Sequence, residues 1–173
     1  MPGYIERALI KFTHPTTSPT TFTSCLHSTK VGKTQQLTSL PDTSSFLDQP
    51  GIRHVQEVVG VLLYYDRCVN IPILPSLTTI GSTQAAATEQ SIIVITQLLD
   101  NCTTHPNPTL RFTRSAMILR IRSDASYLSV TKARSRTVGF FYLYDNTDTP
   151  SLSGTIHVLC AILKNVMVSA AEA

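Results

Sequence analysis

Asp124 is the residue of this 173-residue sequence best placed for metal chemistry. It follows a stretch, 117–122, in which side chains alternate in a way typical of a strand, so it falls near that strand's end. A strand is a rigid support, and an Asp at its end can direct a carboxylate into a metal site. The alternative is an Asp that starts a turn or pairs with Arg120 or Arg122, which alternation places on the same face. Composition alone favours this second interpretation.

A cluster of basic residues forms a second candidate site, consisting of Arg111, Arg114, Lys132, Arg134 and Arg136. Seven of the 14 basic residues lie between Arg111 and Arg136, and that stretch holds one acid, Asp124. Such a concentration can bind the phosphates of a nucleic acid duplex, with an affinity that falls steeply as salt rises. The alternative is a solvated loop surface. Only two aromatic residues lie inside the cluster, so base stacking of a single strand is not favoured.

The elements before these candidates are predicted to be helical. Residues 1–12 carry apolar side chains at helical spacing. From Thr13 to Pro50, 20 of 38 residues are Ser, Thr or Pro, so we expect a disordered linker over 13–52. The segment 53–110 is predicted as a helical connection, with helices over 54–67, near 77–82 and over about 86–101. The first of these has an apolar stripe that ends at Asp66.

The elements that carry the candidates are predicted to be strands. After Pro108 the hydrophobic period changes from 3.6 to 2. Residues rich in β-branched and aromatic side chains predict three consecutive antiparallel strands, around 117–122, 138–144 and 155–163. The fold class is therefore predicted to be α+β, with helices followed by a partial three-stranded antiparallel sheet.

The composition excludes a large multidomain enzyme and a membrane span. Charged residues make up only 14%, while the chain has 24 Thr and 17 Ser, so neutral hydroxyls supply much of its polar surface. No apolar stretch approaches the ~18 residues of a span, and the start lacks a secretory signal. We therefore expect a cytoplasmic or nuclear protein. The four cysteines, at 25, 68, 102 and 160, lack zinc-site spacing and are predicted to be free thiols.

Several segments, taken in order, resemble the Pol polyprotein of copia-type LTR retrotransposons. Residues 1–5 resemble the end of the family's reverse transcriptase, and 58–64 resemble the helix that joins it to ribonuclease H. Residues 123–127, 133–141 and 154–158 resemble the first three ribonuclease H strands, the second with the Arg-rich turn before it. Residues 168–173 resemble the start of the next helix. The resemblance implies a reverse transcriptase-like end over 1–12 and a truncated ribonuclease H-like domain over 111–173. The segment 13–52 is unmatched.

The resemblance also implies a chemistry and its residues. In ribonuclease H, four carboxylates hold two Mg²⁺ ions that activate water and stabilise the leaving oxygen as the RNA strand of an RNA–DNA hybrid is cut. Asp124 matches the first of these carboxylates. Glu172 matches the Glu that precedes the second, so it is a weaker candidate metal ligand. The other catalytic acids are expected to lie outside this chain. We therefore expect no activity and no bound Mg²⁺ in the chain by itself, although its parent would act as RNA-directed DNA polymerase and ribonuclease H.

The expected partners are an RNA–DNA hybrid or other nucleic acid and the rest of the Pol polyprotein. An uncovered sheet would expose Val138, Phe140, Tyr142, Ile156 and Val158 or their alternates, so self-association is also expected. The alternative from another class is a small, non-catalytic nucleic-acid-binding or scaffolding α+β protein. A third hypothesis is an open reading frame without a selected function.

Overall fold

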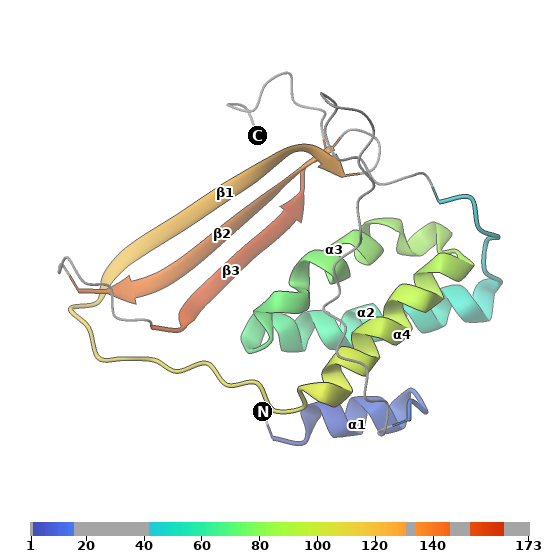
Figure 1. Cartoon of the computed structure of the whole chain (residues 1–173), viewed down its shortest axis with the longest axis horizontal. Helices are drawn as coiled ribbons and strands as arrows, with labels where there is room; N and C mark the ends of the chain where they lie inside the picture. Colours follow the sequence, from blue (N-terminus) through green and yellow to red (C-terminus); the bar gives the residue numbers. More distant parts are fainter. Residues whose placement is uncertain (1, 16–41, 131–133, 146–152, 165–173) are drawn as a thin grey trace. The chain divides into compact units, whose positions relative to one another are not determined.

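The computed structural model describes residues 2–15, 42–130, 134–145 and 153–164 (Figure 1). It confirms the α+β class, because four α-helices precede a three-stranded antiparallel sheet. The chain divides into two compact units. We call the first, built from the four helices, the helical unit, and the second, built from the strands after Thr109, the sheet unit. Among the described residues, no helix has the length and apolar character needed to cross a membrane.

The helical unit surrounds an aliphatic core. Its α-helices are α1 (Tyr4–Lys11), α2 (Gln49–Cys68), α3 (Leu74–Thr83) and α4 (Glu89–Thr104), with short 3₁₀ turns η1 (Ile71–Ile73) and η2 (Gln84–Ala86). Each α-helix buries one stripe of side chains, as its periodicity predicts. The most buried members are Ile5, Val55, Val58, Leu62, Leu77, Ile95 and Leu98. Burying each such side chain stabilises the fold by about 1.5–3 kcal/mol relative to exposure.

Helix α2 begins earlier than the sequence predicts. It starts at Gln49, inside the segment expected to be a disordered linker. Asp48 precedes the helix, and its Oδ1 accepts the N–H of Gly51 at 2.9 Å. An acidic residue at this position satisfies a free N–H of the first turn, and Pro50 is tolerated there because its missing N–H would have no partner. The predicted linker therefore ends before residue 52, and its part over 16–41 lies outside the described residues.

The residues before α2 are attached to the start of α4. The backbone N–H of Leu47 donates to the carbonyl of Ala87 at 2.9 Å, and that of Glu89 donates to Ser45 at 3.0 Å. Thr88 precedes α4, and its N–H donates to Ser91 Oγ at 3.1 Å, which caps the helix. The two backbone bonds join residues that are 40 and 44 positions apart in sequence.

Helix α1 belongs to the helical unit rather than to a separate segment. The ring of Tyr4 stacks on Tyr65 of α2, with centroids 5.1 Å apart and an interplanar angle of 3°. His14 Nε2 lies 2.9 Å from Asp100 Oδ1 of α4, in a largely buried pair. The predicted helix over 1–12 thus forms, and it packs with the helices that follow the linker.

The sheet unit has the three predicted strands in sequence order. They are β1 (Ile118–Val130), β2 (Arg134–Tyr144) and β3 (Thr155–Ile162), and Figure 1 shows β2 between the other two. The register of β1 with β2 runs from Ile118 opposite Tyr144 to Val130 opposite Arg134. Directly paired residues of antiparallel strands lie on the same face, so this register decides which side chains meet.

One face of the sheet exposes aliphatic side chains. Leu119, Ile121 and Leu159 are 56%, 53% and 44% exposed, and the register places them on a common face. Of the residues expected to be exposed, Ile156 is 49% exposed, whereas Tyr142 and Val158 are buried. Val138 and Phe140 are half-buried, and among the alternate positions of β3 Leu159 is exposed. The expected exposure is therefore found only in part. The described cysteines, Cys68, Cys102 and Cys160, are free thiols as predicted, and Cys25 lies outside the described residues.

Candidate nucleic-acid interface

The face opposite the exposed aliphatics combines arginines of β1 with tyrosines of β2. Arg120 is paired with Tyr142, and Arg122 with Phe140. Since alternate residues of a strand point the same way, Tyr144 lies on this face too. We call the surface made by Arg120, Arg122, Tyr142 and Tyr144 the arginine–tyrosine face.

Each arginine lies over a tyrosine ring. The guanidinium carbon of Arg120 is 4.2 Å from the centroid of Tyr144, and that of Arg122 is 5.7 Å from the centroid of Tyr142. The two tyrosine rings meet edge to face, with centroids 6.2 Å apart. Both tyrosines are buried, whereas both arginines are exposed. Cation–π attraction of about 0.5–1 kcal/mol per pair therefore holds each exposed guanidinium on a fixed support.

Asp124 lies on the same face, in an exposed position opposite Val138. Its Oδ1 accepts the backbone N–H of Ala125 at 2.8 Å. Among the described residues, no ion pair joins Asp124 to Arg120 or Arg122, because the guanidinium groups lie on the tyrosine rings instead. Asp124 also lies in the middle of β1, not near a strand end and not at the start of a turn as predicted from the sequence. Neither the turn nor the pairing that composition favoured is therefore found among the described residues.

The residues around Asp124 do not fit a two-metal centre. Mg²⁺ is bound by oxygen ligands, and a pair of ions needs several carboxylates together. Within the described ranges, no group of three or more His, Cys, Asp or Glu side chains is placed to hold a metal ion. Glu172, the other candidate ligand, lies outside these ranges. We therefore derive no reaction step through Mg²⁺ for this chain.

The structure separates the predicted basic cluster into two groups. Exposed Arg111 and Arg114 precede β1, where the N–H of Gly154 donates to the Arg111 carbonyl at 2.6 Å. Arg134 and Arg136 begin β2, at the opposite end of the β1–β2 ladder. With about 3.3 Å per residue, the two groups are separated by roughly 25 Å of strand. Lys132 lies outside the described residues.

Sequence reasoning missed the role of Arg120 and Arg122. It treated them only as ion-pair partners of Asp124. In the structure they lie on β1 between the two basic groups, each over a tyrosine ring. A signal was present, because Arg120 and Arg122 are two residues apart and so are Tyr142 and Tyr144. The strand register was needed to place one pair over the other.

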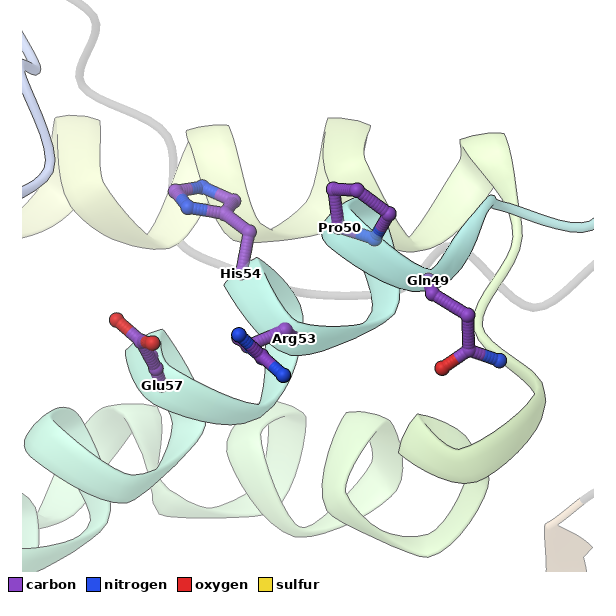
Figure 2. A pocket seen from close by; sticks show the side chains of 5 residues that line it. All are labelled: Gln49, Pro50, Arg53, His54 and Glu57. Atoms are coloured by element: carbon purple, nitrogen blue, oxygen red, sulfur yellow. The ribbon is translucent and has the colours of Figure 1, made fainter.

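A hollow of about 370 Å³ lies on the helical unit (Figure 2). Its five lining residues, Gln49, Pro50, Arg53, His54 and Glu57, all come from the first turns of α2. Glu57 forms an ion pair with Lys11 at 3.7 Å, and the His54 ring packs edge-on against Phe12 at 5.8 Å. Glu57 and His54, whose types would suit an acid–base pair, therefore both make structural contacts with the α1 region.

Asp66 is the most perturbed titratable group of the helical unit. It is fully buried on α2, and neither carboxylate oxygen has a hydrogen-bond partner among the described residues. Burial raises its pKa to about 9, so Asp66 is protonated at neutral pH. Burial, with Asp66 as a lesser cause, also raises the pKa of nearby Cys102 to about 12. Ionising a buried carboxyl group without partners destabilises the fold, so Asp66 should make stability depend on pH.

The comparisons with known proteins leave the family resemblance as a hypothesis. No family model matches the chain, and no curated protein or solved structure is significantly similar to it. The function must be argued from the geometry above.

Proposed function

We propose that this chain binds the phosphate backbone of an RNA–DNA hybrid through the arginine–tyrosine face and does not cleave it. The observation that carries the proposal is the pair of exposed guanidinium groups held over buried tyrosine rings. The proposed origin is a ribonuclease H-like remnant of a copia-type Pol polyprotein, whose other parts would be its partners. This origin rests on the order of the resembling segments.

The geometry of the face suits phosphates better than bases. Arg120 and Arg122 are alternate residues of one strand, so their Cα atoms are about 6.6 Å apart. Two cations at that spacing can contact successive phosphates, and a planar guanidinium binds phosphate oxygens through two N–H groups. The tyrosine faces are occupied by guanidinium groups, so they are not free to stack on bases.

We expect binding without cleavage because Asp124 is the one acid that the described strands place on this face. A two-metal hydrolysis needs clustered carboxylates, and Asp124 has Arg122 as its neighbour on the strand face. The arginine favours a bound phosphate beside Asp124 and opposes the accumulation of further positive charge.

The test is the affinity of the full chain for a fluorescently labelled RNA–DNA hybrid, measured by anisotropy. The double variant Arg120→Gln/Arg122→Gln should bind at least about tenfold more weakly at low salt, because two phosphate contacts are lost. A control, Arg7→Gln/Arg53→Gln, removes the same charge from exposed positions of the helical unit. Equal losses in both variants would contradict a defined interface.

The same samples test cleavage. The hybrid should stay intact with Mg²⁺ in the wild type and in Asp124→Asn. Cleavage by the wild type that disappears in Asp124→Asn would overturn the non-catalytic proposal and leave the binding proposal standing.

A non-catalytic scaffolding role is the second candidate. It is favoured by the exposed Leu119, Ile121 and Leu159, because contiguous exposed aliphatics mark protein-binding surfaces. The surface could also support self-association. Sedimentation of wild type and Leu119→Lys/Ile121→Lys would detect it as a concentration-dependent mass that only the wild type shows.

A further inference from the structure

A second hollow of the helical unit has the features of a small-molecule site. Its volume is about 740 Å³, within the usual range of ligand pockets. Its walls come from η1, the start of α3, the end of α4 and the segment that follows α4. Four prolines line it, namely Pro72, Pro75, Pro106 and Pro108. Because proline has a fixed φ, these walls need little ordering when a ligand enters.

Asn70 supplies an unused hydrogen-bond donor on this wall. It is only 6% exposed, and its Nδ2 has no partner among the described residues. Asn70 precedes η1, where an Asn side chain usually caps the turn, yet it makes no cap bond. Pro72 has no N–H to offer there, and the Ile73 N–H donates to the Asn70 backbone carbonyl at 3.4 Å. A buried amide N–H without a partner destabilises the fold, and a ligand acceptor would remove that penalty.

The other groups of the hollow define the charge of the ligand. His105 is the only titratable residue among the lining side chains, so no fixed charge awaits an ionic ligand. Asn101 and Thr104 belong to the last turn of α4. The Asn101 carbonyl accepts the N–H of His105 at 2.9 Å. This end of the helix carries partial negative charge, which disfavours an anion.

We propose that this hollow binds an uncharged aromatic carboxamide. The ligand carbonyl accepts an N–H of Asn70 Nδ2, the N–H side of the ligand amide faces the negative end of α4, and the ring lies against the prolines. A carboxylate would meet the negative helix end, and an amidinium cation would offer no acceptor to Asn70.

The test uses three probes that share one ring, benzamide, benzoate and benzamidine, in titrations of the ¹⁵N-labelled full chain followed by NMR. Benzamide should shift the side-chain amide of Asn70 and the backbone amides of Asn101, Thr104 and Asn107, saturating in the millimolar range that a fragment of this size reaches. Benzoate and benzamidine should bind at least about fivefold more weakly. Equal or tighter binding of either ion, or no saturable shift with benzamide up to about 10 mM, would overturn the proposal.

Two variants assign the effect to Asn70. Asn70→Leu should weaken benzamide binding at least about fivefold, since it removes the donor. Asn70→Asp keeps the shape but replaces the donor by an acceptor, and it should show the same loss if Asn70→Leu fails to fold. The control Gln90→Leu removes an exposed amide at the other end of α4 and should leave binding unchanged. Unchanged binding in a folded Asn70 variant would contradict the assignment.

Discussion

Leu98 of α4 and Leu119 of β1 are identical side chains in opposite settings. Leu98 has no exposed surface, whereas Leu119 is 56% exposed. Each α-helix of the helical unit buries one stripe, although Ile10 and Ile93 are exposed on other faces, whereas exposed aliphatic and cationic side chains alternate along the first part of β1. The comparison indicates that residues of the helical unit chiefly maintain a fold, and that residues of β1 are available for binding.

The largest effect should come from the helical core. Leu98→Ala should lower the free energy of unfolding by about 2–5 kcal/mol, because it removes buried methyl groups and leaves a cavity. Urea unfolding followed by circular dichroism measures this change. Ile93→Ala on the same helix and Leu119→Ala on β1 remove exposed side chains and should each cost less than about 0.5 kcal/mol. A Leu119→Ala cost as large as that of Leu98→Ala would break the comparison.

The next effect concerns the buried acid within the helical core. Asp66 keeps its proton in the folded state up to a pKa of about 9, whereas the unfolded chain releases it near the ordinary aspartate pKa of 3.8. The unfolded state therefore binds fewer protons between these values, and stability should fall by about 1 kcal/mol for each pH unit from 5 to 8. Asp66→Asn cannot ionise and should remove this slope.

The control for that slope is Glu89→Gln, which changes an exposed acid at the start of α4. It should retain the wild-type pH dependence. Burial, with the charge of Asp66 as a lesser cause, raises the pKa values of its neighbours Tyr65 and Cys102 to about 12, so both stay neutral over the measured range. A wild-type stability that is flat from pH 5 to 8 would contradict a buried, unpaired Asp66.

A smaller effect on hybrid affinity is expected when Arg120 loses the tyrosine ring that supports it. Tyr144→Leu removes the ring beneath Arg120, so hybrid affinity should fall about two- to fivefold, the equivalent of a cation–π contact of 0.5–1 kcal/mol. Tyr144→Phe keeps the ring and should retain wild-type affinity. An equal loss in both variants would assign the effect to the hydroxyl rather than to the stack.

Hydrophobic period predicted much of the fold. The 3.6-residue pattern from Val55 to Asp66 gave the buried stripe of α2, and the change to a period of 2 gave the three strands. The start of α2 was harder to predict from the sequence, because Pro50 and Gly51 usually interrupt helices. The structure shows that Asp48 caps the first turn. The contact of His14 with Asp100 joins residues 86 positions apart, which local patterns do not encode.

The candidate site was predicted only in part. The sequence located the basic stretch between Arg111 and Arg136, but the length of the β1–β2 ladder separates its members. Arg120 and Arg122 were considered only as partners of Asp124, because the tyrosines that support them lie 24 and 20 residues later in the sequence. Register, a tertiary property, decides that pairing.

The most direct test of the central claim is the salt dependence of hybrid binding. The logarithm of the affinity of wild type and Arg120→Gln/Arg122→Gln would be plotted against the logarithm of the salt concentration. Each phosphate contact contributes close to one unit of slope, so the double variant should have a slope shallower by about 2. Parallel lines for the two proteins would mean that these arginines contact no phosphate, and the arginine–tyrosine face would not be the nucleic-acid interface.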